Sequence, residues 1–247
     1  MKLKNKIALV TGASRGLGRA SAVELAKAGA KVIINHLNDE QSAVETLKLV
    51  KEYTDGEIIQ TDVADPVAVQ AMAARLFSKY GQVDILVNNA GVIIRPGFWN
   101  IQSDEDINRT IDVVLKGQLN CMRAFAPAMQ KAKWGRIINI ASTNGQTGTP
   151  AILAYSAAKA GVINATYAMA KALAQDGITV NSVSPGVFDT DMTKGAPEQV
   201  TQSIIETTPL KRLGKPEEIG EAVRFLAEAD FITGHVLVVD GGLLLNT

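Results

Sequence analysis

A tyrosine and a lysine stand four residues apart in LAYSAAKAGV, residues 153–162. This alanine-rich stretch favours helix, and positions i and i+4 of a helix lie on one face. A free tyrosine ionises near pH 10, too high for a base at neutral pH, and a nearby ammonium group favours the phenolate. Tyr155 and Lys159 could therefore form a general acid/base pair. The same spacing also occurs by chance on ordinary helix surfaces.

A glycine-rich segment, TGASRGLG at residues 11–18, follows the first apolar run and leads into a helical pattern. Gly12, Gly16 and Gly18 allow a tight turn and a close approach of the backbone to a ligand. Free N–H groups at the helix start favour a phosphate. Because the turn follows the first strand of an alternating α/β pattern, we interpret it as a dinucleotide-binding turn.

Polar and small residues follow two further strands, as TDV at 61–63 and NNAG at 88–91. Ligands of open α/β sheets bind outside the carboxyl ends of the strands, where these residues fall. Asp62 either contacts an adenine or caps the next helix, and Asn88 and Asn89 either line the crevice or form turns.

The end of the second strand distinguishes NAD(H) from NADP(H), because NAD(H) sites usually carry a carboxylate there. Here the segment reads Asn35-His36-Leu37, and Arg15 of the glycine loop could bind a 2′-phosphate. These residues favour NADP(H). NAD(H) stays open, because no second basic residue stands at that strand end.

Seven β-branched runs alternate with six alanine-rich stretches. The predicted strands are 6–11, 31–35, 56–60, 83–88, 135–141, 177–183 and 235–241. The predicted helices are about 16–29, 39–53, 66–80, 103–131, 154–176 and 216–227. This alternation predicts one α/β domain over residues 1–247, a Rossmann-type doubly wound parallel sheet of about seven strands with helices on both faces. The segment 186–215 breaks the rhythm and is either a substrate lid or a surface insertion.

The composition excludes several functional classes. Lys plus Arg equal Asp plus Glu at 25 each, so no global charge points to nucleic acid or an anionic membrane. The apolar run near the start ends at Gly12, too short for a signal peptide, and Cys121 is the single cysteine. His36 and His235 have no metal-ligand companions, so we expect no metal site. We expect a cytoplasmic protein.

In this setting the sequence resembles the short-chain dehydrogenase/reductase family over essentially its whole length. The resemblance rests on TGASRGLG, NNAG, Ser142 in INIAS, YSAAK, NSVSPG and ITGHVLVVDGG, which occur in the family's order and spacing. It implies an oxidoreductase that uses NAD(P)(H) to interconvert a ketone and a secondary alcohol.

The resemblance assigns roles to individual residues. Tyr155 would be the general acid/base, Lys159 its activator and ribose anchor, and Ser142 the group that polarises the carbonyl. Pro185, Gly186, Val187 and Thr190 would line the nicotinamide. The other expected cofactor contacts, besides Tyr155 and Lys159, are Gly12, Ser14, Arg15, Gly16, Leu17, Gly18, His36, Asp62, Val63, Asn89, Ala90 and Gly91.

One position departs from the family pattern. Family members usually carry an asparagine in the fourth long helix that completes a proton relay to the lysine, and Val114 occupies that position here. Because valine forms no side-chain hydrogen bond, the relay must use backbone and water, or another side chain, or work less well. Asn120 lies on a different face of the helix and is no obvious substitute.

Two classes of substrate are compatible with the sequence. The resemblance extends to 3-oxoacyl-ACP reductases, which place basic residues near the active-site entrance for the acidic carrier protein. Lys131, Lys133 and Arg136 fit that pattern, whereas Asp176 does not. The alternative is a sugar, sugar-acid or polyol dehydrogenase, in which Arg95 would hold a carboxylate. Candidate pocket walls are Trp99, Gln146, Thr147 and Phe188.

Two further expectations concern the whole protein. The family usually forms tetramers through two long helices and the C-terminal segment. That segment reads VDGGLLLNT here, and it is buried either against a neighbouring subunit or against the core of its own chain. A hypothesis from another functional class is that the protein is a cofactor-binding regulator or scaffold with impaired catalysis. Val114 is its sole support.

Overall fold

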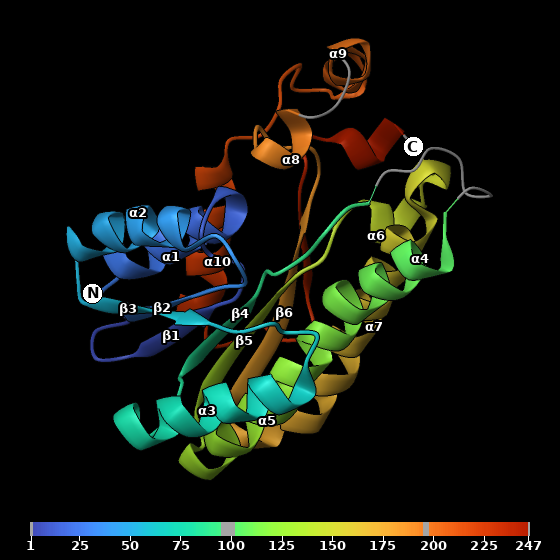
Figure 1. Cartoon of the computed structure of the whole chain (residues 1–247). Coiled ribbons are helices and arrows are strands. Elements are labelled where there is room, and N and C mark those ends of the chain that lie inside the picture. Colours follow the sequence, from blue (N-terminus) through green and yellow to red (C-terminus); the bar gives the residue numbers. More distant parts are fainter. Residues whose placement is uncertain (1, 95–101, 195–197, 247) are drawn as a thin grey trace.

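A single sheet of seven parallel strands organises the chain (Figure 1). The computed structural model describes residues 2–94, 102–194 and 198–246. The strand order is β3-β2-β1-β4-β5-β6-β7, as expected for a Rossmann-type fold. The strands are β1 Ile7–Val10, β2 Lys31–His36, β3 Gly56–Gln60, β4 Ile85–Asn88, β5 Gly135–Ile140, β6 Ile178–Pro185 and β7 Val236–Val239.

Helices cover both faces of this sheet (Figure 1). On one face lie α1 Gly16–Lys27, α2 Glu40–Lys51 and α10 Pro216–Glu228. On the other lie α3 Pro66–Tyr80, α5 Gly117–Ala132 and α7 Leu153–Leu173. Shorter elements are α4 Asp104–Ile111, α6 Asn144–Thr147, α8 Asp191–Lys194 and α9 Glu198–Thr207.

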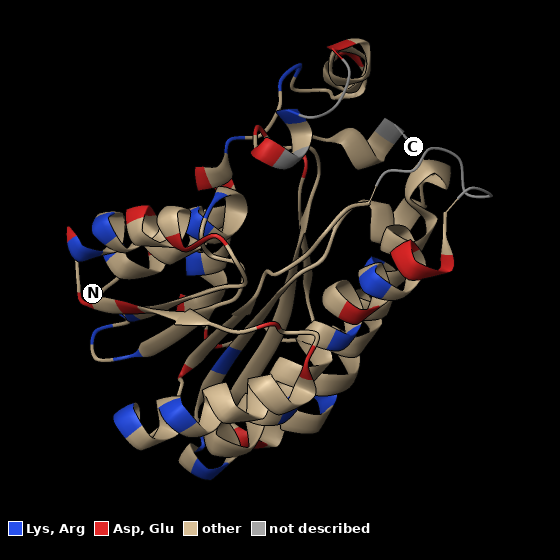
Figure 2. Cartoon of the chain, viewed as in Figure 1, with Lys and Arg blue, Asp and Glu red and all other residues tan. Residues whose placement is uncertain are grey.

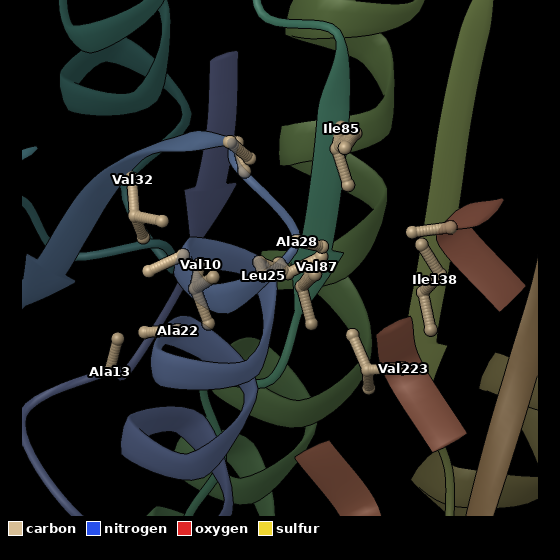
Figure 3. Packing of buried hydrophobic residues seen from close by; sticks show 14 of the residues in the cluster. Val10, Ala13, Ala22, Leu25, Ala28, Val32, Ile85, Val87, Ile138 and Val223 are labelled. Carbon is tan, nitrogen blue, oxygen red and sulfur yellow. The ribbon is translucent and has the colours of Figure 1, made fainter. Parts of the chain in front are cut away.

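Small and branched apolar side chains fill the space between sheet and helices. In Figure 3, Ala22 and Leu25 of α1 lie beside Val10 of β1, and Val223 of α10 approaches Val87 of β4. The alanines let α1 pack closely on the sheet, so the glycine loop before α1 is held at the strand ends.

The long helix predicted over 103–131 is interrupted by a π-helical turn, η2 Asp112–Lys116, between α4 and α5. The N–H of Gly117 bonds to the carbonyl of Asp112, five residues earlier. Such turns are frequent at functional sites, and this one contains Val114, which is fully buried.

Backbone hydrogen bonds join the two ends of the segment after β6, and the residues between them project from the molecule. The N–H of Asp189 donates to the carbonyl of Gly214, and the N–H of Gly214 donates to that of Val187. Between these points α9 projects from the body of the molecule in Figure 1, and no α9 residue is buried.

The direction of the strand connections reverses between β1 and β4, which are neighbours in the sheet. In doubly wound sheets such a reversal opens a crevice at the carboxyl ends of the strands. None of the helices in the described ranges combines the length and apolar character needed to cross a bilayer.

Candidate active site

The glycine loop between β1 and α1 closely contacts the loop after β4. A Cβ on Gly12, whose φ is +60°, would stand 2.9 Å from Cα of Ala90. A Cβ on Gly18 would overlap the carbonyl oxygen of Gly12. Gly16, with a φ of +56°, also has a backbone conformation that favours glycine. The loop therefore leaves its backbone accessible where a phosphate group can approach.

Two asparagines hold this loop. The Asn89 side chain donates to the carbonyls of Thr11 at 2.8 Å and Gly12 at 2.9 Å, so this asparagine anchors the loop. Asn35, which the sequence places only at a strand end, accepts from the N–H of Gly12 at 3.3 Å. A polar residue at the end of a buried strand was the signal that could have identified it.

Further contacts brace the remaining predicted cofactor residues of the loop region. The carbonyl of Ser14 accepts from the Arg19 side chain and from the Thr46 hydroxyl, each at 2.8 Å. The N–H of Ala90 donates to the Thr11 hydroxyl at 3.0 Å. Around Gly91 there is space, since its Cβ would meet nothing closer than 3.7 Å. Leu17 packs partly buried against the core.

Asp62 and Val63, which follow β3, are held in place by different groups. Asp62 accepts from the N–H of Ala64 at 2.9 Å and forms an ion pair with Arg109 at 3.1 Å. It does not cap the next helix, because Asp65 accepts from the first N–H groups of α3. The Val63 carbonyl accepts from the side chain of Asn120 at 3.0 Å. Asn120 thus positions the 62–63 loop.

The end of β2 and the glycine loop present polar groups where an adenosine would lie. His36 is buried, and its Nδ1 has no hydrogen-bond partner among the described residues. Arg15 is exposed and stands 3.7 Å from carboxylates of both Asp39 and Asp191. The close backbone cradle and the free Nδ1 fit a dinucleotide.

Ser142, Tyr155 and Lys159 meet at the carboxyl end of β5. Ser142 lies two residues beyond the strand, and its influence through hydrogen bonding lowers the pKa of Tyr155. Lys159 is buried, its Nζ donates to the carbonyl of Ile140, and it lies 5.5 Å from the centre of the Tyr155 ring. The helical i, i+4 spacing therefore places phenol and ammonium side by side.

Burial dominates the ionisation of this pair. It raises the pKa of Tyr155 to about 12, an effect that the Ser142 hydrogen bond opposes. Burial also lowers the pKa of Lys159 to about 7. The sequence predicts that the Lys159 ammonium group favours the phenolate. In the structure, the loss of solvent on burial has the larger effect on the Tyr155 pKa. Near neutral pH the phenol is a proton donor.

The residues after β6 close the crevice between this pair and the glycine loop. The carbonyl of Pro185 accepts from the N–H of Thr143 at 3.0 Å, next to Ser142. Gly186 must be small, since its Cβ would stand 2.7 Å from that of Asp240. A Cβ on Gly16 would lie 3.6 Å from Cγ2 of Thr190. Val187 lies between them, so the segment 185–190 links the two parts of the site.

The basic residues named for a carrier protein lie elsewhere. Lys131 and Lys133 precede the amino end of β5, whereas Ser142 follows its carboxyl end. In Figure 2 the lower ends of α3 and α5, rich in Lys and Arg, are far from α6, which follows Ser142. Lys133 is paired with Asp176, and Arg136 is buried.

The structure places the residues predicted to line a substrate pocket in different environments. Arg95 and Trp99 lie outside the described residues. Phe188 is buried in the core and packs over Gly214, so it is not a pocket wall. Gln146 donates to the Ser184 hydroxyl at 2.9 Å, while Thr147 is exposed.

Comparisons with known proteins agree with this geometry. The family model described as enoyl-(acyl carrier protein) reductase matches residues 12–244. A 3-oxoacyl-(acyl-carrier-protein) reductase of Synechocystis is 40% identical, with 98% of both chains covered. One from Staphylococcus aureus is 39% identical, covering 97% of this chain and 98% of its own.

Solved structures extend the range of relatives. A putative short-chain alcohol dehydrogenase from Sinorhizobium meliloti has a TM-score of 0.93 at 34% identity, covering 99% of this chain and 98% of that one. A putative gluconate dehydrogenase from Agrobacterium tumefaciens has a TM-score of 0.93 at 36% identity, covering 98% and 97%.

Proposed function

Because the chain belongs to the short-chain dehydrogenase/reductase family of oxidoreductases, we propose that Ser142, Tyr155 and Lys159 carry its interconversion of a ketone and a secondary alcohol. The observation that carries this assignment is their meeting at the carboxyl end of β5, on the same edge of the sheet as the glycine loop, with Lys159 Nζ 5.5 Å from the centre of the Tyr155 ring. The bound nicotinamide dinucleotide supplies the hydride in reduction and accepts it in oxidation.

Each side chain has a distinct part in the reduction. Tyr155, protonated at neutral pH, donates its proton to the carbonyl oxygen as that oxygen gains charge. Ser142 donates a hydrogen bond to the same oxygen. Lys159 provides positive charge close to the phenol and compensates the phenolate that forms. In the oxidation the same groups remove the proton of the alcohol.

We assign the dinucleotide to the crevice along the carboxyl edge. The glycine loop, residues 11–18, would bind the pyrophosphate, with His36, Asp62 and Val63 at the adenosine. Residues 89–91 and 185–190 would line the remainder. Arg15 is placed to bind a 2′-phosphate, which supports NADP(H), while its neighbours Asp39 and Asp191 oppose a phosphate. We favour NADP(H) because Arg15 is exposed in the glycine loop and no carboxylate stands at the end of β2.

The first candidate substrate is a 3-oxoacyl thioester, on the strength of the curated reductases that are 37–40% identical. The second is a sugar acid or polyol, supported by the gluconate dehydrogenase structure. The pairing of Lys133 and the burial of Arg136 favour the second, because neither is free on the surface for an acidic carrier protein. In either case we propose that residues 186–215 act as a lid over the substrate.

A substrate panel tests the function. Purified protein is assayed with 3-oxoacyl thioesters, sugar acids, polyols and simple ketones, each with both dinucleotides. We expect turnover with at least one class, and for Tyr155→Phe a loss of at least about 1,000-fold in kcat in a protein that still binds the dinucleotide. Arg15→Leu should raise the KM for NADPH and spare that for NADH. Dinucleotide binding with no turnover of any substrate would overturn the proposal and favour a regulator.

A further inference from the structure

A buried glutamine lies behind the catalytic lysine. Gln118 belongs to the first turn of α5 and follows Val114 by one helical turn. Its Nε2 donates to the carbonyl of Ile140 at 3.3 Å. That carbonyl also accepts from Nζ of Lys159. One backbone oxygen therefore joins the glutamine to the lysine.

The orientation of the Gln118 amide follows from this contact. A carbonyl oxygen only accepts hydrogen bonds, so the amide nitrogen must face Ile140. The other atom, Oε1, is then directed away as an acceptor. It is buried and has no donor within the described part of the chain. A buried amide oxygen without a donor is costly, and such atoms are nearly always satisfied by a protein group or an ordered water.

Lys159 has the complementary need. Its ammonium group has three donors, and the described contacts use one of them, on Ile140. Because Nζ and the Gln118 amide nitrogen bind the same oxygen, a single water can bridge Nζ and Oε1. In the family pattern the relay asparagine stands at this position. Val114 stands there in this chain, and its side chain offers no such acceptor.

We propose that Gln118 is the positioning residue for Lys159, replacing the absent asparagine by accepting, through Oε1, a hydrogen bond from the lysine or from a water bound to it. This rests on the proposed function for its kinetic consequence, but its effect on Lys159 exists without substrate. An acceptor at this place favours the charged form of the lysine. No charged side chain in the described ranges shifts the Lys159 pKa, and Tyr155 is the titratable group at its side.

The direct test measures the pKa of Lys159. It is obtained by NMR titration of 13C-labelled lysine in the protein without dinucleotide, and the Lys159 signal is identified by its absence in Lys159→Met. Gln118→Met keeps the length of the side chain and removes the acceptor, so the pKa should fall by about one unit. Gln118→Glu should raise it. Shifts of opposite sign separate this role from a packing role. Gln130→Leu, a change of the same residue type on the same helix, should leave it unchanged.

The kinetic test uses the same variants. In Gln118→Met the alkaline limb of the kcat profile should move to lower pH by the same amount, because the lysine loses its proton earlier. Adding Val114→Asn should restore it. An unchanged Lys159 pKa in both Gln118 variants would refute the proposal whether or not a substrate is found. A shifted pKa without turnover would leave the inference standing and count against the proposed function.

Discussion

Lys159 is buried, and the lowered pKa of its side chain should make folding depend on pH. Its pKa is about 7 in the folded protein and its ordinary value is 10.5. Between these values the unfolded chain binds more protons than the folded one, so stability rises with pH. We expect the wild-type protein to gain up to about 1.4 kcal/mol per pH unit over Lys159→Met between pH 7 and 9. Urea unfolding without dinucleotide measures it.

Tyr155→Phe is the control for this measurement. The Tyr155 pKa is raised from 10.0 to about 12, so folded and unfolded chains both keep that proton below pH 9. The stability curve of the variant should therefore run parallel to that of the wild-type protein over this range. Parallel curves for wild type and Lys159→Met as well would show that the lysine is not buried as described.

Residue types and spacing predicted Tyr155 beside Lys159, because the helix alone fixes an i, i+4 pair. The partners of buried polar groups were not predictable in the same way. Asn120 binds the loop after β3, and Gln118 binds the end of β5, two contacts that depend on tertiary packing. A polar residue one turn after Val114, on the same helical face, was the available signal.

At the scale of elements, the turn between β1 and α1 depends on the absence of a side chain at Gly18. Its φ is ordinary, but a Cβ there would overlap the Gly12 carbonyl and stand 2.5 Å from Nδ2 of Asn89. Gly18→Ala must therefore displace the loop. We expect a destabilisation of about 1–3 kcal/mol together with weaker dinucleotide binding, measured by urea unfolding and by fluorescence titration.

Gly81→Ala is the matched substitution. Gly81 ends α3 with a φ of +81°, and its Cβ would meet nothing within 4 Å. The variant should lose about 1 kcal/mol through backbone strain while dinucleotide binding stays at the wild-type level. Equal binding losses in both variants would mean that the effect of Gly18→Ala is only a loss of stability.

The periodic elements were predictable, because buried parallel strands have continuous apolar runs and the helices have long amphipathic ones. All seven strands and the six long helical stretches appear near their predicted limits. The π-helical turn at 112–116 and the short helices α6, α8 and α9 were missed. Each is set by local hydrogen bonds or by packing against a neighbour, which leave no periodic signal.

At the scale of the molecule, one edge of the sheet is apolar and uncovered. The four residues of β7, Val236–Val239, are only half-buried, and Phe225 on α10, a helix that contacts β7, and Phe231 before β7 are exposed. Exposed apolar groups next to an incompletely covered edge strand indicate a surface that another chain covers. Together with the tetramer that the family resemblance implies, this leads us to propose a homotetramer that buries this edge.

Light scattering coupled to gel filtration tests the assembly. We expect the wild-type protein to elute as a tetramer and the double variant Phe225→Glu, Phe231→Glu to elute as a smaller species, because each chain would bring two charges into the buried interface. Val67→Glu is the control, since Val67 is 76% exposed in the first turn of α3, where a carboxylate is favourable. A wild-type monomer, or a double variant that remains tetrameric, would refute the proposed interface.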